Sequence, residues 1–448
     1  MRADVRRGIL AIGVWLALTA PAFGQGVEAL APTSFAEAPD LDQGRVVWSA
    51  RVGQTVRAFS RPAAGGASLT AGEADLGRRG QRASSVWRVA SGGGRTGLWV
   101  APEKGNRYEL FGGPFGSALT HLRTTPPGAP EVTARDFWAW AGGFVTLERQ
   151  GAALHPVVTG GVESARALTL PPGADASTLA VSDTLAAVVV ASERVDVLDL
   201  ASGAVVRSVA LGEAEDSTIF SLSVDADGAL ALTTVAGPDA LLWAPVGANR
   251  FEVVMTGDRF GLVQIAGGRI AFVEPGGRTD AARPVVVEPR ADGEPTVVFR
   301  GPPAFQVESL DFDGTHVAWA THVCQFVAKA EPAASTVTVP AGPCARSDIS
   351  IASFATPRVS RRNPGLPVYV RCLTAPTARC RLDVRAYGFE GKRLGRLRTT
   401  VPRGARRLLR VPLGRRDADR LRRADDNNTF FIIRTVDPDG KIRRLGPL

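Results

Sequence analysis

The amino-acid sequence predicts an all-β protein in two parts, a seven-bladed β-propeller followed by a small β-sandwich. Three observations support this prediction. A motif of a short apolar strand, a Gly-centred turn and a second apolar strand returns about seven times between residues 41 and 319. Residues 26–354 show no sustained helical periodicity. The remaining chain alternates apolar and polar residues in short runs, as strands with one buried face do.

The repeats align on their turns, at residues 44, 94, 143, 184, 228, 268 and 314. The first copy spans residues 41–48, the last spans 310–319, and a weaker copy lies at 86–100. Successive turns are 40–50 residues apart, which is the length of a four-stranded propeller blade. We therefore predict seven blades over residues 25–355.

Each repeat reads as a hairpin with one buried face, because β-branched and aromatic residues alternate on both sides of its turn. A second, more polar hairpin follows each copy and is clearest at residues 195–206, around the turn Ala201-Ser202-Gly203. One blade cannot cover both of its own faces. The blades must therefore stack around an axis, and the ring must close.

The first 24 residues predict a signal peptide. Arg2, Arg6 and Arg7 precede an apolar run over residues 8–20, and Ala20-Pro21-Ala22 offers small residues for cleavage. An uncleaved N-terminal anchor is the alternative, which the shortness of the run disfavours. The Arg6-Arg7 pair also resembles a twin-arginine signal, with ordinary secretion preferred. We expect a secreted or extracytoplasmic mature protein without a transmembrane segment.

All four cysteines lie after residue 320, and an even number in an exported chain predicts disulfides. Four cysteines allow three pairings, and nearness in sequence favours Cys324 with Cys344 and Cys372 with Cys380. The first bond would tie the last blade, and the second would staple a hairpin. A zinc site is disfavoured, because paired Cys-x-x-Cys spacings are missing and no histidine lies near Cys372 or Cys380.

Charge divides the chain near residue 356. Residues 356–448 carry 24 Lys plus Arg against 8 Asp plus Glu, a net charge of +16, which leaves −7 for residues 1–355 of the whole-chain +9. The junction, residues 356–365, has the Pro and Gly content of a linker. We therefore expect an acidic propeller joined to a basic second domain over residues 356–448.

The basic segment predicts about seven short strands in some ninety residues, which is the scale of an Ig-like β-sandwich. Residues 415–424 suit a brief helical crossover. The segment resembles a C-terminal module of exported proteins from high-GC actinobacteria, in its Val370-Arg371-Cys372 strand, its second Cys, its Arg-rich leucine strand and its Asp-x-x-Gly hairpin. This resemblance implies an extracellular β-sandwich and no particular activity.

The propeller resembles the broad group of WD40-like and TolB-like propellers found in periplasmic and secreted proteins. The resemblance covers most of residues 26–354 and is one of architecture. The Trp-Asp dipeptides of true WD40 repeats are missing.

A set of arginines in the basic segment forms a candidate polyanion-binding surface. Its members are Arg403, Arg406, Arg407, Arg410, Arg415, Arg416, Arg420, Arg422 and Arg423. Its partner would be an anionic envelope polymer, membrane headgroups or the acidic propeller itself. The alternative is genome composition, since arginine replaces lysine throughout the chain. Nucleic acid is disfavoured, because the protein is predicted to be exported and no aromatic residues interleave with these arginines.

The sequence contains no Gly-x-Ser-x-Gly elbow, His-Glu-x-x-His helix or phosphate-binding glycine loop, so we predict no catalytic residue, no metal and no cofactor. His316 and His322 in the last blade are the candidates for a histidine in the central channel. The Asp-x-Asp-Gly runs at Asp225, Asp311 and Asp437 read as hairpin turns rather than calcium loops.

The tryptophans recur mainly on predicted blade strands. Such spacing favours packing between blades over a carbohydrate platform. Trp138 and Trp140, on the same face of one strand, are the pair that would matter most for a glycan.

The sequence therefore predicts an exported, non-enzymatic interaction scaffold. Its propeller would bind an unknown ligand or protein through loops such as residues 92–97 and 276–283, and its basic domain would dock to anionic envelope components. The alternative is a secreted propeller hydrolase or lyase that acts on a glycan or lactone. Histidines and carboxylates gathered at one end of the channel would favour that enzyme.

Overall fold

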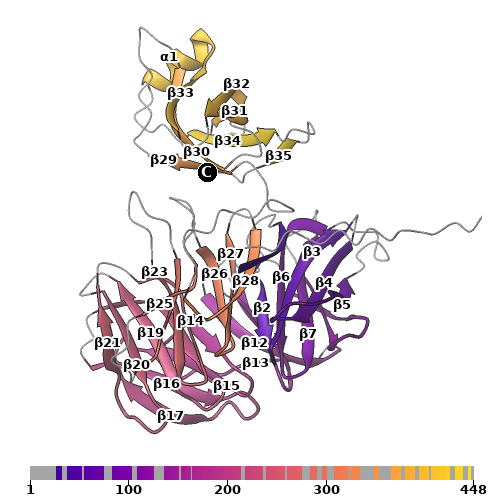
Figure 1. The fold of residues 1–448 in the computed structure, drawn as a ribbon, viewed down its shortest axis with the longest axis vertical. Helices are drawn as coiled ribbons and strands as arrows, with labels where there is room; N and C mark the ends of the chain where they lie inside the picture. The colour runs from indigo at the N-terminus through magenta and orange to yellow at the C-terminus, as the bar shows by residue number, and fades with distance from the viewer. Residues whose placement is uncertain are drawn as a thin grey trace, which may run out of the picture.

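The computed structural model, drawn in Figure 1, confirms the predicted all-β, seven-bladed propeller. It describes residues 27–32, 38–52, 55–74, 83–102, 108–125, 136–150, 153–162, 164–212, 217–235, 239–257, 260–274, 283–289, 295–299, 307–321, 324–332, 348–352, 365–374, 379–388, 393–402, 405–423, 429–436 and 442–444. The predicted signal peptide therefore lies outside the described residues. Within them, no helix is long and apolar enough to span a membrane.

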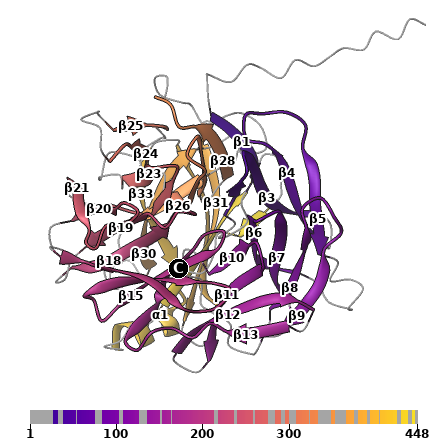
Figure 2. The same ribbon diagram turned by 90° about the horizontal axis from the view of Figure 1, so that it is seen from below.

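The propeller consists of seven four-stranded sheets. Figure 2 shows from below how they are arranged around one axis. The first blade consists of β2 (Asp40–Asp42), β3 (Arg45–Val52), β4 (Thr55–Pro62) and β5 (Leu69–Ala74). The second consists of β6 (Ala83–Gly92), β7 (Arg95–Pro102), β8 (Glu109–Pro114) and β9 (Thr120–Thr124). The third consists of β10 (Phe137–Trp140), β11 (Gly143–Gln150), β12 (Ala153–Gly161) and β13 (Ser164–Ala167).

The next three blades are β14 (Ala174–Val181), β15 (Leu185–Val190), β16 (Arg194–Asp199) and β17 (Val205–Ala210); β18 (Thr218–Val224), β19 (Leu230–Val235), β20 (Ala240–Ala244) and β21 (Glu252–Thr256); and β22 (Val263–Ala266), β23 (Arg269–Glu274), β24 (Arg283–Val287) and β25 (Thr296–Val297). All neighbouring strands within these sheets are antiparallel and consecutive in the chain.

The seven predicted turns are confirmed as the tips of the innermost hairpins. Gly44 joins β2 to β3, and Gly228 joins β18 to β19. Gly314 has φ +90°, a left-handed conformation that residues with a Cβ rarely adopt. The periodic glycines of the sequence therefore mark turns that need them.

The last blade closes the ring with a strand from the other end of the chain. Its order is β1 (Val27–Pro32), β28 (Cys324–Lys329), β27 (His316–Thr321) and β26 (Val307–Phe312). β1 is the outermost strand and pairs antiparallel with β28, with Val27 opposite Ala328. The first repeat predicted from the sequence begins at residue 41, so β1 was not among the predicted strands.

The core consists of apolar layers between neighbouring blades. Trp99 and Trp319 are among the largest fully buried side chains. Trp138 and Trp140 belong to a buried cluster that also holds Leu179 of β14. The prediction that the tryptophans pack between blades is thus confirmed at these positions, and Trp138 and Trp140 form no exposed aromatic platform.

The basic segment forms two sheets. One has the order β29 (Asp348–Ala352), β30 (Gly365–Thr374) and β33 (Arg406–Pro412); the other has β32 (Arg393–Pro402), β31 (Arg379–Gly388), β34 (Thr429–Val436) and β35 (Ile442–Arg444). The helix α1 (Arg415–Arg423) lies where the sequence suited a helical crossover. β29 precedes the expected domain start at residue 356 and yet pairs with β30.

The two sheets and α1 share one core, which includes Val370, Val384 and Leu421. The predicted disulfide between Cys372 and Cys380 is present and links the first sheet to the second. Cys324 is also disulfide-bonded, and its predicted partner Cys344 lies outside the described residues. Six described strands lie within residues 356–448, where about seven were predicted, and β29 adds a strand from before the expected boundary; an Ig-like topology remains a prediction.

Candidate functional site

The innermost strands of the seven blades surround a central cavity of about 510 Å³. Every blade contributes at least one side chain to its wall: Asp40 of β2, Arg88 of β6, Trp138 of β10, Thr178 of β14, Ser221 of β18, Gln264 of β22 and Ser309 of β26. Most of these side chains are polar. We call this space the channel cavity.

A buried ion pair stands in the wall where the second and third blades meet. The Arg88 Nε donates to Asp136 Oδ1 at 3.1 Å, and the two side chains are 8% and 5% exposed. Burial raises the pKa of Asp136, and the Arg88 guanidinium opposes that rise. Burial also raises the pKa of Tyr108, and the Asp136 carboxylate adds to the effect. This pair places two strong hydrogen-bonding groups beside the cavity.

The wall formed by the next two blades is irregular, because their innermost strands, β14 and β18, both bulge. In β14, Asp175 pairs with Val189 of β15, and the next paired residue, Ala180, lies opposite Ala187. The residues of β14 between Asp175 and Ala180 therefore bulge out of the regular pairing. Within this bulge the Thr178 hydroxyl accepts a bond from the Val189 N–H at 3.0 Å and donates to the Asp175 carbonyl at 2.8 Å. Bulges of this kind re-aim side chains beside functional sites.

The bulge of β18 contains Phe220, where the register shifts between Ile219 and Ser221. The Phe220 side chain is 53% exposed although it borders the cavity. An exposed aromatic ring beside polar groups offers a ligand an apolar face to pack against.

Side-chain oxygens of β18 bind the backbone of the next innermost strand. The hydroxyls of Ser221 and Ser223 accept from the N–H groups of Val263 and Ile265 at 3.2 and 3.1 Å. Ser223 also donates to Gln264 Oε1 at 3.2 Å, which orients the amide and leaves its Nε2 as a donor. The strands thus hold these groups rigidly in place.

Carboxylates join blades near the hairpin tips. Asp40 accepts from the Ser91 N–H at 2.7 Å, and Asp225 accepts from the Gly267 N–H at 2.9 Å. Burial raises the pKa of Asp42, and the nearby Asp183 and Asp311 carboxylates raise it further. This end of the channel therefore carries closely spaced negative charge.

The Asp-x-Asp-Gly runs at Asp225 and Asp311 are hairpin turns, as predicted. The Ala229 N–H donates to Asp227 Oδ1, and the Thr315 N–H donates to Asp313 Oδ1, both at 2.8 Å. In both runs the first aspartate also bonds to the neighbouring blade. The third run, at Asp437, lies outside the described residues.

The described histidines lie away from the cavity wall. His316 begins β27, is 9% exposed and has its Nδ1 2.9 Å from the Thr315 hydroxyl. His121 pairs with Glu109 on outer strands of the second blade, at 2.6 Å. No histidine is found among the described residues that border the channel cavity, and His322 lies outside them. The channel histidine considered from the sequence is not formed by His316.

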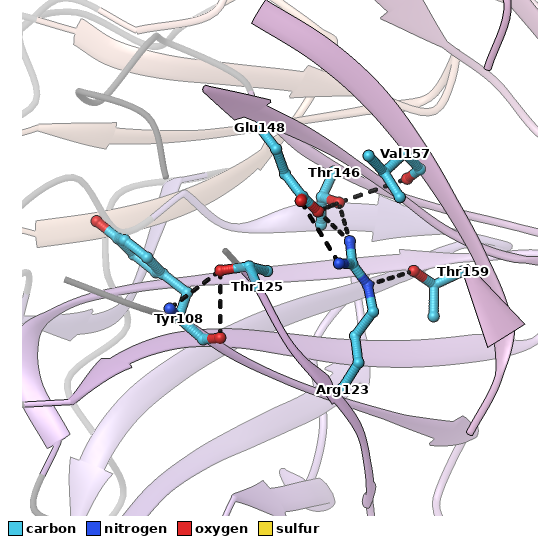
Figure 3. Close-up of polar contacts among 7 residues, drawn as sticks. All are labelled: Tyr108, Arg123, Thr125, Thr146, Glu148, Val157 and Thr159. Atoms are coloured by element: carbon cyan, nitrogen blue, oxygen red, sulfur yellow. Dashed lines mark hydrogen bonds and ion pairs between the residues drawn. The ribbon is translucent and has the colours of Figure 1, made fainter. Parts of the chain in front are cut away.

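A second buried ion pair, shown in Figure 3, joins the second and third blades outside the channel. Arg123 of β9 pairs with Glu148 of β11, and Arg123 Nε donates to the Thr159 hydroxyl at 2.9 Å. The Thr146 hydroxyl bonds to both charged groups. Because every partner belongs to this one interface, the role of the cluster is structural: it holds the second and third blades together.

The structure describes part of the predicted arginine surface. Arg406, Arg407, Arg410, Arg415 and Arg416 are exposed. Arg420, Arg422 and Arg423 belong to α1, with side chains outside the described set, and Arg403 is outside it entirely.

The sequence did not single out Asp383, which pairs with Arg396 at 2.7 Å and with Arg385 at 3.1 Å. Bonds from these two arginines lower the pKa of Asp383 to about 2.

No protein-family model matches this chain, and no curated protein sequence matches it. Solved structures do resemble it. BamB from Moraxella catarrhalis is 13% identical, with 65% of this chain and 84% of BamB covered and a TM-score of 0.36. The propeller domain of the trilobed protease from Pyrococcus furiosus is 13% identical, with 66% and 92% covered and a TM-score of 0.40. The Cps50 (Swd1) propeller domain from Myceliophteria thermophila is 12% identical, with 67% and 98% covered and a TM-score of 0.42. These likenesses concern the fold alone.

Proposed function

We propose that the protein is an exported, non-enzymatic interaction scaffold. Its propeller binds a compact polar ligand, or a segment of a partner protein, in the channel cavity. Its basic C-terminal domain docks to anionic components of the cell envelope. The observation that carries the proposal is the channel cavity itself, because all seven blades turn side chains toward one space of about 510 Å³.

The lining suits binding. A volume of this size falls within the range of small-molecule sites. The Arg88–Asp136 pair, the hydroxyl-bearing bulge of β14 and the Gln264 amide supply both donors and acceptors. Because β-strands hold these groups in position, a ligand loses little binding energy to ordering the site. Phe220 adds an apolar face at the wall.

Charge supports the docking half of the proposal. Residues 356–448 carry a net charge of +16, and nine arginines among the described residues of this segment have exposed side chains, five of them in the predicted arginine surface. Such a surface attracts anionic polymers and headgroups over distances set by the salt concentration.

The channel is tested by photocrosslinking. A benzophenone amino acid replaces Phe220 in one version of the mature chain and Val206, an exposed residue of β17 on the outer rim, in a matched control. Both proteins are irradiated with isolated cell envelopes and with concentrated growth medium. A discrete adduct at position 220 that is missing at position 206 supports a channel ligand. Equal labelling at both positions contradicts it.

Docking is tested by pull-down with the full mature chain and with residues 25–347, which end before β29. Envelope binding by the full chain that salt releases, and that the shorter chain lacks, supports docking through the basic domain. Equal retention of both chains rules that role out.

A further inference from the structure

The outward face of the three-stranded sheet in the basic domain is amphipathic. In β30 the side chains of Leu366, Val368 and Val370 point into the core, and in β33 those of Leu409 and Val411 do so. The alternate residues therefore face outward. Tyr369 and Leu408 on this face are 38% and 41% exposed, and they are among the large apolar side chains that the fold leaves in water.

Strand register gathers these side chains. Tyr369 lies directly opposite Leu408, and Pro367 lies opposite Arg410. The Arg406 guanidinium stacks over the Tyr369 ring, 4.7 Å from its centroid. Two apolar side chains thus lie between two arginines, and neither β30 nor β33 contains an acidic residue.

We propose that this outward face, formed by Tyr369, Leu408, Arg406 and Arg410, binds the surface of an anionic phospholipid bilayer. The inference rests on the proposed docking function and specifies its target. A soluble polyanion would need the arginines alone. A bilayer interface also rewards an exposed aromatic ring and an aliphatic side chain, which enter the headgroup region while the guanidinium groups reach phosphates. The two strands that carry these four side chains have no carboxylate to offset the attraction, and Asp348 of β29 lies opposite Thr374, several residues along β30 from Tyr369.

The test is co-sedimentation of the full mature chain with vesicles. One set contains phosphatidylglycerol and phosphatidylcholine in equal parts, and the other contains phosphatidylcholine alone. We expect binding to the first set only, weakened by salt. The variant R406A/R410A should partition about 30-fold more weakly, since each arginine near an anionic surface contributes about fivefold. The variant Tyr369→Ser with Leu408→Ser should lose about tenfold.

The matched control is Arg393→Ala with Arg398→Ala, which removes the same charge from exposed positions of β32 in the other sheet. It should keep most of the vesicle binding. An unchanged thermal unfolding midpoint shows that each variant folds. The inference is overturned if the variant with Tyr369→Ser and Leu408→Ser binds vesicles as well as the unaltered chain does. It is also overturned if the control loses as much vesicle binding as R406A/R410A.

Dextran sulfate, a soluble polyanion, separates this inference from the proposed docking. If the unaltered chain binds dextran sulfate but ignores anionic vesicles, the bilayer inference fails and electrostatic docking stands. If it binds neither probe, both fail.

Discussion

The Glu28 carboxylate of β1 forms an ion pair with the Arg61 guanidinium of β4 at 2.6 Å. Glu28 belongs to the outermost strand of the last blade, and Arg61 belongs to the first blade, so the contact spans the closure of the ring. The Arg61 side chain is 4% exposed while that of Glu28 is 50% exposed. A partly solvated carboxylate therefore compensates a buried charge.

Glu28→Ala should destabilise the propeller by roughly 1–3 kcal/mol, because it leaves the buried Arg61 guanidinium without this partner. Urea unfolding measures the effect. Glu331→Ala is the matched control, since the Lys329–Glu331 pair in the same blade has side chains 56% and 69% exposed and should matter little. Equal effects of the two substitutions would show that the Glu28 contact does not strengthen closure.

Arg123→Met should cost about 3–5 kcal/mol, because it leaves the Glu148 carboxylate, 2% exposed, buried without its counter-ion. Replacing both residues by methionine should cost less than the sum of the single changes. Arg57→Met is the control, because the Arg57–Glu73 pair is 38% and 35% exposed. Additive single effects in a double-mutant cycle would show that Arg123 and Glu148 are not energetically coupled.

Gly112→Ala should destabilise the fold strongly, by an amount on the order of 1–3 kcal/mol. Gly97 and Gly112 lie opposite each other in β7 and β8, and a Cβ on either would overlap the Phe144 ring of the next blade. Gly161→Ala is the control, because a Cβ there meets nothing within 4 Å. Thermal unfolding of both variants checks the difference, and a Gly112→Ala protein as stable as the control would disprove the overlap.

Asp383 should make the basic domain lose stability in acid. Its pKa is about 2 in the folded protein against a usual 3.8, so the folded state takes up this proton at a lower pH than the unfolded state does. The stabilisation is therefore complete at a pH above the usual pKa and disappears as the pH falls through the pKa of the folded protein. Urea unfolding above and below that window should show a smaller pH dependence in Asp383→Asn. An unchanged dependence would contradict the assignment.

Asp42 should show the opposite sign. Burial and the neighbouring Asp183 and Asp311 carboxylates raise its pKa, so its charged form opposes folding at neutral pH, and stability is gained as the pH falls through the raised value. Asp42→Asn should therefore stabilise the propeller near neutral pH. The amide can keep the contact with the Ser91 hydroxyl, which is 3.4 Å from the Asp42 carboxylate. A loss of neutral-pH stability would refute this expectation.

The blades could be predicted because their signals are local. A glycine at a turn and alternating residues beside it are contiguous in the chain, so Gly44, Gly228 and Gly314 were enough to place three hairpins. β1 has no such turn. Its partner β28 is at the far end of the propeller, and nothing within residues 27–32 indicates that pairing.

The channel was harder to predict for a similar reason. Ser221 and Ser223 could have been found by counting back from the turn at Gly228, since the innermost strand must face the axis. Arg88 and Asp136 come from different blades, and only the closed ring brings them together. Of the two ligand loops expected from the sequence, residues 92–97 form a hairpin tip and the adjoining strand ends and do not border the cavity. The other, residues 276–283, lies outside the described set except for Arg283, the first residue of β24.

Closure by β1 has a consequence for how the chain matures. β1 leaves the ribosome first among the propeller strands, and its partner β28 leaves last. Until then the nascent chain carries an unpaired edge at both ends, which is where intermolecular strand exchange begins. At high concentration, β1 of one molecule can occupy the place beside β28 of another and give a domain-swapped dimer. A circular permutant that begins within residues 33–37 and fuses β1 behind β28 would turn this late, long-range step into a local one.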